Sequence, residues 1–277
     1  MKEKKDMKRL ALVLALVMCI GLLASPAAAV SSKGSYGKVP LYKGAITIDG
    51  KIDDIYKKGL LIDLAGKFPG NYGGDTTGKA YVLHDGANIY LAIEVDNKYP
   101  LGAYTDALAN YGSGYKETAV ELYFDWKDDG ASSMKWIAWA DAKSQIFEKE
   151  DNAEKGLVKE YKATSDAAKK TYIMEYKIQL ASGVKTGSNV GWCVMLNANT
   201  DPKNPKQEKI AIPTKLNNIN VANKPAEWLS FTLDSTENKF EAPKDPAASA
   251  ATADPAVLAV VSLAAATGAA FISKKRK

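Results

Sequence analysis

The residues best suited to chemistry in this sequence lie on one short stretch, 117–126, which reads Glu-Thr-Ala-Val-Glu-Leu-Tyr-Phe-Asp-Trp. Apolar and polar residues alternate there with a period of two, as in a strand with one buried face. The alternation places Glu121 and Tyr123 on the face opposite the apolar residues, and Tyr111 and Tyr115 lie just upstream. An aromatic ring that packs on the C–H face of a sugar, beside a carboxylate that accepts its hydroxyls, is the chemistry needed to hold a carbohydrate.

Two further aromatic residues, Trp136 and Trp139, lie on the predicted strand 134–140. Residues three apart on a strand point to opposite faces. One of the two rings is therefore expected in the core, and the other is a candidate platform for a sugar. The alternative interpretation of all these residues is an ordinary solvated strand face beneath a long loop.

The same strand does not supply a pair of carboxylates for glycoside hydrolysis. Glu121 and Asp125 share a face at a spacing of four residues, which separates them by about 13 Å along a strand. Glycosidases hold their two carboxylates about 5–9.5 Å apart. The single histidine, His84, follows a strand and has no triad or zinc partners in the sequence. We therefore expect a non-catalytic protein.

Both ends of the chain look like targeting segments. Residues 1–29 combine a basic start, an apolar run and small residues, which predicts a secretory signal peptide. Residues 242–255 are rich in Pro and Ala and predict a linker. Residues 256–273 are apolar and just long enough to span a bilayer, and the basic tail 274–277 would stay in the cytoplasm. We expect a secreted domain, held at the cell surface by this C-terminal transmembrane helix.

Charge and cysteine content describe what lies between these ends, 30–241. The formal net charge of the chain is +5, of which +3 belongs to residues 1–29 and +4 to the last four residues, which leaves −2 for the remainder. No basic patch predicts a nucleic-acid partner. Only Cys193 remains after the signal peptide, so no internal disulfide can form, and this cysteine is expected to be a core residue.

The pattern along 30–241 predicts an all-β domain, an antiparallel β-sandwich of jelly-roll type with about ten strands. Asp85-Gly86 between two β-rich runs marks a hairpin. The predicted strands cover these ranges: 45–48, 60–64, 79–84, 89–95, 117–126, 134–140, 156–163, 172–180, 191–198, 209–212 and 228–233.

Several motifs in this order resemble the family 9 carbohydrate-binding modules, of the cellulose- and xylan-binding type. Residues 48–56, Ile-Asp-Gly-Lys-Ile-Asp-Asp-Ile-Tyr, resemble the family's opening motif IDGxIDxxW. The hairpin 81–95 and the strands 119–125, 172–180 and 191–197 are similar to later motifs of the family. The resemblance implies a β-sandwich that binds the ends of sugar chains between two aromatic rings, with bound calcium for structure.

Carried over by position, the resemblance implies that Tyr115 is the first ring and that Glu121 accepts sugar hydroxyls. The second ring would fall within 215–221, where the sequence has no aromatic residue and Asn218 is the candidate contact. The basic residue expected on the next strand would fall near Ile137 and is also absent. The loop aspartates Asp49, Asp53 and Asp96 offer the oxygen ligands that calcium prefers.

The sequence thus predicts a non-catalytic glycan-binding domain on the surface of a Gram-positive type cell. Its ligand would be a polysaccharide or oligosaccharide. Two alternatives remain at this point: a structural or adhesion domain that has lost the sugar site, and an accessory domain linked to glycoside hydrolysis.

Overall fold

A computed structural model describes residues 34–70, 75–101, 118–130, 133–139, 146–151, 156–200, 208–220 and 224–240, of which 133–139 and 146–151 are described by their backbone alone. The predicted signal peptide, linker, anchor and basic tail lie outside these residues. Among the residues described, no helix is long and apolar enough to cross a membrane.

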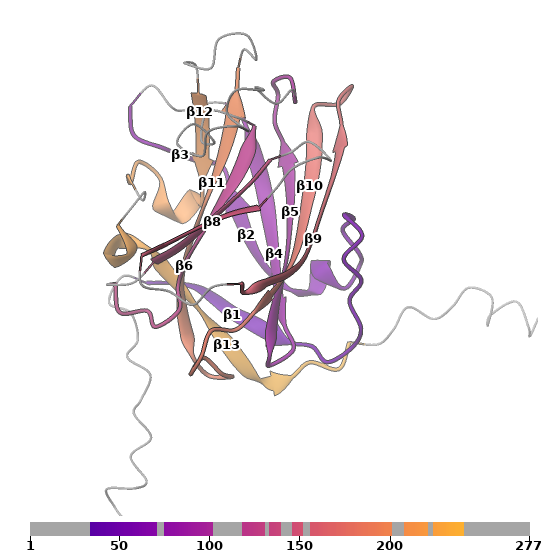
Figure 1. The fold of residues 1–277 in the computed structure, drawn as a ribbon, viewed down its shortest axis with the longest axis vertical. Coiled ribbons are helices and arrows are strands. Elements are labelled where there is room, and N and C mark those ends of the chain that lie inside the picture. Colours follow the sequence, from indigo (N-terminus) through magenta and orange to yellow (C-terminus); the bar gives the residue numbers. More distant parts are fainter. Residues whose placement is uncertain are drawn as a thin grey trace, which may run out of the picture. The chain divides into compact units, whose positions relative to one another are not determined.

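Strands dominate the described part of the chain (Figure 1). Three short 3-10 helices accompany them: η1 (Tyr56–Lys58), η3 (Thr214–Leu216) and η4 (Pro225–Glu227). The strands are β1 (Ser35–Leu41), β2 (Leu60–Leu64), β3 (Gly66–Lys67), β4 (Thr77–His84), β5 (Asn88–Asp96), β6 (Ala119–Asp125), β7 (Ser133–Trp139), β8 (Ile146–Asp151), β9 (Val158–Asp166), β10 (Thr171–Gln179), β11 (Asn189–Asn199), β12 (Glu208–Ile212) and β13 (Leu229–Glu237).

Hydrogen bonds connect all these strands into one sheet. The main path runs β8-β7-β6-β11-β13-β1-β4-β5-β10-β9, while β12 pairs with β11 and β3, and β2 pairs with β4. Pairing is antiparallel except at β1, which runs parallel to both β13 and β4. The predicted all-β, mostly antiparallel architecture is confirmed, with this parallel strand as a correction.

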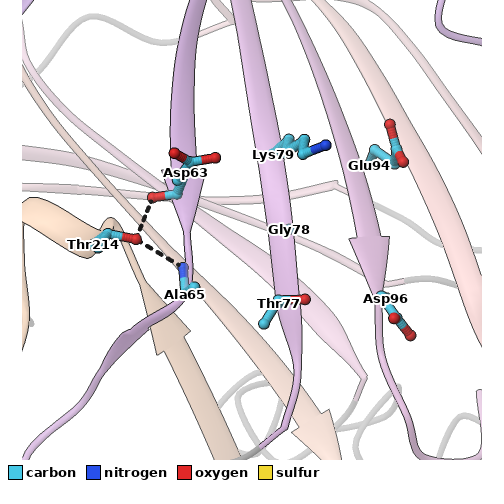
Figure 2. A pocket seen from close by; sticks show the side chains of 8 residues that line it. All are labelled: Asp63, Ala65, Thr77, Gly78, Lys79, Glu94, Asp96 and Thr214. Atoms are coloured by element: carbon cyan, nitrogen blue, oxygen red, sulfur yellow. Dashed lines mark hydrogen bonds between the residues drawn. The ribbon is translucent and has the colours of Figure 1, made fainter.

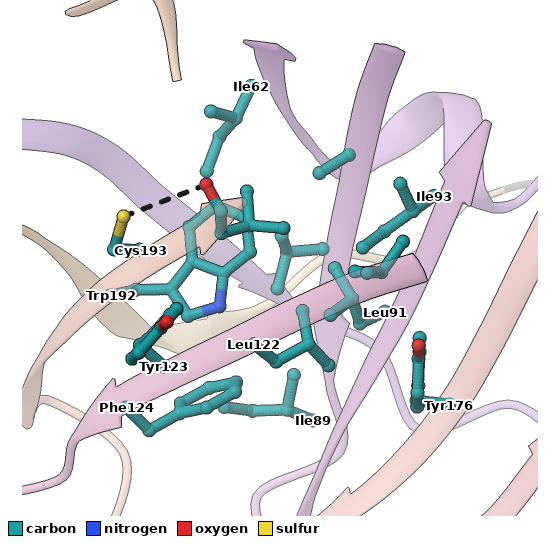
Figure 3. Close-up of a cluster of buried hydrophobic side chains, with 14 of the residues drawn as sticks. Ile62, Ile89, Leu91, Ile93, Leu122, Tyr123, Phe124, Tyr176, Trp192 and Cys193 are labelled. Carbon is teal, nitrogen blue, oxygen red and sulfur yellow. Dashed lines mark hydrogen bonds between the residues drawn. The ribbon is translucent and has the colours of Figure 1, made fainter. Parts of the chain in front are cut away.

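The sheet is folded over so that two of its parts face each other across one apolar core. Leu122 and Phe124 of β6 and Trp192 of β11 lie on one side, and Ile89 and Leu91 of β5 lie on the other (Figure 3). All five side chains are buried. Facing sheets that bury interdigitated side chains in this way form a sandwich.

Most predicted strands are present, among them 60–64 as β2, but the first predicted strand, 45–48, is not. Residues 45–48 alternate correctly and yet form no strand. Strand β1 lies earlier, where Gly37 and Pro40 interrupt the local pattern. Its partner β13 lies almost 200 residues further along the chain, so local periodicity does not reveal the pairing. Strands β3 and β8 were also not predicted.

The motif at 48–56 is held against the sheet by one buried carboxylate. Glu175 of β10 accepts hydrogen bonds at Oε2 from the backbone N–H groups of Asp49 and Gly50, both at 2.8 Å, and at Oε1 from the Tyr56 hydroxyl at 2.7 Å. Gly50 has φ +82°, and an added Cβ would lie 2.7 Å from Cγ2 of Thr164. Glycine is therefore required at this turn. Burial raises the pKa of Glu175, against the lowering effect of its three donors.

We expect Tyr56→Phe to lower the free energy of unfolding by about 1–3 kcal/mol, because it leaves a buried Glu175 oxygen without its donor. Denaturant titration of the full chain measures the loss. Tyr81→Phe is the matched control, since no described hydrogen bond involves the Tyr81 hydroxyl, and its effect should stay within about 0.5 kcal/mol. Equal effects of the two variants would contradict a role for Glu175 as the anchor of this segment.

His84 connects three strands at one end of the sheet. Its carbonyl oxygen accepts a hydrogen bond from the N–H of Tyr42 at 2.7 Å, and its Nε2 lies 2.9 Å from the carbonyl oxygen of Asp234. The side chain is buried, and no described residue bonds to its Nδ1. Desolvation lowers the pKa of His84, although the nearby Asp85 and Asp234 oppose the shift.

The neutral ring is therefore favoured in the folded protein, so stability should fall as the pH drops below the ordinary histidine pKa of about 6.5. We expect a slope of at most about 1.4 kcal/mol per pH unit in the free energy of unfolding. His84→Asn should remove this slope, and it removes the only histidine. The raised pKa of Asp125 and that of Glu175 act in the opposite direction in both proteins, so the difference between wild type and variant isolates His84. Identical slopes would refute the assignment.

Candidate functional site

The candidate site lies on the face of β6 and β11 opposite to that of Leu122 and Trp192. Glu121 is opposite Met195 in the register, and Tyr123 is opposite Cys193. Residues Val120 and Leu122 alternate with them and point inward. All seven residues of β6 are buried, so both faces of this strand are covered. The prediction that one face of this strand is exposed is therefore wrong.

A second layer accounts for part of this burial. The Trp228 ring lies beside that of Tyr123, with the centroids 5.5 Å apart and the planes tilted by 60°. Trp228 follows η4 and is itself fully buried. An indole packed on a tyrosine ring excludes water from one side of the polar groups next to it.

Three side chains form what we call the Glu121 cluster: Glu121, Tyr123 and Asn197. The Tyr123 hydroxyl donates to Glu121 Oε2 at 2.6 Å, and Asn197 Nδ2 donates to Oε1 at 2.5 Å. All three side chains are at most 2% exposed. Hydrogen bonds to a carboxylate are short and about twice as strong as neutral ones, so the cluster fixes the position of the carboxylate.

Asn197 has an acceptor that the described residues leave unused. Its Oδ1 is buried, and no described donor reaches it. A buried polar atom without a partner costs about 1–3 kcal/mol. Asn197 Oδ1 is therefore the atom of the Glu121 cluster for which the described residues supply no donor.

The backbone at the start of β6 is also tied down close to the cluster. Thr118 Oγ1 donates to the carbonyl oxygen of Pro100 and accepts from the N–H of Asn199, both at 3.4 Å. These bonds link the end of the segment that follows β5 to β11. Tyr111 and Tyr115 belong to the part of that segment outside the described residues.

The predicted tryptophans are placed by register alone. Trp136 is opposite Leu122, and Trp139 is opposite Ala119. Because directly opposed residues share a face, Trp139 holds a position on the face of Glu121 and Trp136 a position on the core face. The prediction that the two fall on opposite faces is confirmed.

Asn218 lies away from β6 in its described contacts. Its N–H donates to the carbonyl oxygen of Lys67 on β3 at 2.7 Å, and Asn217 Oδ1 accepts from the N–H of Lys67 at 2.7 Å. Asn218 is exposed and has φ +65°, a conformation that asparagine tolerates in turns. These contacts place Asn218 in the turn that follows η3 and bind that turn to β3.

Three residues of this face were not predicted as part of the site. Asn197 reaches the cluster from a strand 76 residues further along the chain. Trp228 was assigned to the last strand, although it precedes β13 and packs on Tyr123. Lys135 lies opposite Tyr123, two positions from Ile137, where the basic residue was expected. The one signal in the local sequence was Asn197, a polar residue within an otherwise apolar strand.

A comparison with known protein families identifies the family of this chain. Residues 48–235 match the family model described as carbohydrate family 9 binding domain-like. The chain belongs to this family. No curated protein sequence matches it.

Two solved structures of a family 9 carbohydrate-binding module from Caldicellulosiruptor kristjanssonii share the fold. One is a complex with glucose, with 18% identity, a TM-score of 0.54, and coverage of 74% of this chain and 100% of that chain. The other is a complex with cellotriose, also with 18% identity and a TM-score of 0.54, and coverage of 76% of this chain and 100% of that chain.

The aspartates predicted as calcium ligands do not converge in this family 9 domain. Asp49 forms an ion pair with Lys51 at 2.6 Å, and Asp96 forms one with Lys98. Asp53 is exposed in the turn after Asp49. Within the described ranges, no group of three or more His, Cys, Asp or Glu side chains is placed to share a metal ion. The described residues therefore do not fit a shared calcium site.

Proposed function

We propose that this family 9 domain binds a glycan without catalysis, with the Glu121 cluster as the polar part of the site. The observation that carries the proposal is the Glu121 carboxylate, which Tyr123 and Asn197 hold in place while Asn197 keeps a free buried acceptor. A sugar hydroxyl can donate to that acceptor. Polar groups fixed in advance lose little conformational entropy on binding.

The aromatic part of the proposed site comes from the neighbouring segment and strand. Tyr115 lies three residues before Thr118, whose hydrogen bonds tie that segment to β11. Trp139 holds a register position on the face of Glu121. Rings from these positions would pack on the sugar while Glu121 and Asn197 bind its hydroxyls. Tyr111 is the second ring candidate of the segment.

A structural or adhesion role is the second candidate. It is favoured by the complete burial of the Glu121 cluster and by the Trp228 ring on Tyr123. A covered polar cluster can serve stability alone, because its members satisfy one another. A role beside a glycoside hydrolase would need the same glycan binding as the first proposal.

Binding assays on the full chain separate these candidates. Calorimetry with cello-oligosaccharides, xylo-oligosaccharides and cell-wall glycans should find at least one ligand. Glu121→Gln and Asn197→Ala should each weaken its binding about tenfold or more, since hydrogen bonds to charged groups contribute about 1.5–3 kcal/mol. Tyr115→Ala should also weaken binding, because it removes the ring proposed to pack on the sugar.

The matched control for the charge is Glu237→Gln, an exposed carboxylate near the end of β13. It should bind like the wild type. If no glycan binds, or if Glu121→Gln, Asn197→Ala and Tyr115→Ala all retain full affinity, the structural role is preferred. Release of reducing sugar would overturn the non-catalytic assignment.

We also propose export and membrane anchoring, on the basis of residues 1–29 and 256–277. In a Gram-positive host, we expect the chain in the membrane fraction, accessible to added protease and beginning at Val30. A truncated variant that ends at residue 241 lacks the proposed anchor and should appear in the medium. A full-length cytosolic product that retains Met1 would contradict this proposal.

A further inference from the structure

Strand β13 contains a bulge beside β1, at the point where β4 ends in His84. The register between β1 and β13 shifts after Val39, so residues 234–236 have no partner on β1. The carbonyl oxygen of Asp234 therefore has no donor from that strand. The ring of His84 replaces this missing bond, because its Nε2 lies 2.9 Å from the oxygen.

The backbone of His84 holds the end of β1 at the same point. Within the described strands, Leu41 and His84 form the one residue pair between β1 and β4. The N–H of Tyr42 donates to the carbonyl oxygen of His84 at 2.7 Å. The N–H of Asn238 donates to the carbonyl oxygen of Leu41 at 2.9 Å. Together with Asp234, these residues form what we call the His84 junction, which joins β4, β1 and β13.

The hydrogen bond to Asp234 determines which nitrogen of the His84 ring carries the proton. A carbonyl oxygen can only accept, so Nε2 is protonated in the neutral ring and Nδ1 is left as an acceptor. The side chain is 0% exposed, and Nδ1 has no partner among the described residues. A second proton would have to bind Nδ1, which gives a buried charge and an N–H group without an acceptor.

Two carboxylates act on the ring, those of Asp85 in the turn after β4 and of Asp234 on β13. Both favour the protonated ring, and no other described charged group affects the pKa of His84. The backbone holds both of them, since Asp85 Oδ1 accepts from the N–H of Asn88 at 2.6 Å and Asp234 Oδ1 accepts from that of Thr236 at 3.1 Å. Burial outweighs the two charges and lowers the pKa of His84. The closed junction therefore binds a proton less readily than a junction whose ring reaches water.

We propose that the His84 junction is an acid-sensitive switch, in which protonation of the ring releases the end of β1 from β4 and from the bulge of β13. The charged ring must reach water to be satisfied, so the hydrogen bond from Nε2 to Asp234 breaks. The N–H groups of Tyr42 and Asn238 lose their partners in the same opening.

The opening is confined to the junction, because the first part of β1 is held independently of His84. Val39 is fully buried, and it pairs with Leu233 before the register shift. The Tyr36 hydroxyl donates to the carbonyl oxygen of Trp192 in the core strand β11. The open junction leaves unpaired backbone groups at the edges of β4 and β13, which the closed junction covers.

Hydrogen exchange on the full chain tests the switch at about pH 7.5 and about pH 5.5, on either side of the ordinary histidine pKa of about 6.5. The measured quantity is the protection factor, which is corrected for the intrinsic pH dependence of exchange. We expect the protection of the Tyr42 and Asn238 amides to fall by up to about tenfold per pH unit below about 6.5, because opening is linked to the uptake of one proton. Amides of the paired strands β5 and β10 should keep their protection. Equal losses in both regions would indicate global unfolding and overturn the proposal, as would unchanged protection at Tyr42 and Asn238.

His84→Gln should abolish this response to pH, since the glutamine amide can donate to Asp234 and takes up no proton. Glu237→Gln is the matched control, because it removes an exposed titratable carboxylate opposite Leu41 and keeps His84. It should respond to pH as the wild type does. A full response in His84→Gln, or none in Glu237→Gln, contradicts the assignment of the switch to His84.

NMR titration of the wild type provides a test that needs no variant, since His84 is the only histidine of the chain. We expect its ring to titrate below about 6.5 and to carry its proton on Nε2 at neutral pH. A ring that titrates at or above this value takes up its proton without opening the junction, and the proposal is then wrong.

Discussion

The fold depends on one strand, β1, which connects the two parts of the sheet. It lies between β13 and β4 and runs parallel to both, so a strand near the N-terminus completes pairing with the last strand of the domain. Val39 of β1 is fully buried. The Tyr36 hydroxyl donates to the carbonyl oxygen of Trp192 at 3.2 Å, and its ring meets the Trp192 ring edge-on at 5.8 Å. These contacts connect β1 to the core strand β11, which also carries Asn197.

This closure has a direct consequence for the candidate site. Since one face of β6 and β11 packs into the core and the other is covered in part by Trp228, polar groups on these strands have little access to water. Glu121, Tyr123 and Asn197 bond to one another, while Asn197 Oδ1 has no partner among the described residues. A carboxylate held in this way has a defined geometry, which is what recognition of a specific sugar hydroxyl requires.

The polar groups on the two outer faces of the sheet lie in different surroundings. The Glu121 cluster is buried, so its hydrogen bonds are strong and the loss of one partner is costly. Asp63, Lys79 and Glu94, which lie opposite one another on β2, β4 and β5 (Figure 2), are exposed, so salt screens their charges.

The local sequence was sufficient to predict the strands whose alternation is complete and the Asp85-Gly86 hairpin. It was also sufficient to recognise the motif at 48–56 that resembles the family's opening motif. It was also sufficient to place Glu121 beside Tyr123, and Trp136 and Trp139 on opposite faces. The tertiary structure decided the rest: the parallel strand β1, the covering of Tyr123 by Trp228, the arrival of Asn197 at Glu121 and the row Asp63–Lys79–Glu94. Each of these depends on the register between strands that are distant in the chain. A periodic pattern states which face a residue occupies, but only the pairing of strands states what lies beside it and whether water reaches it.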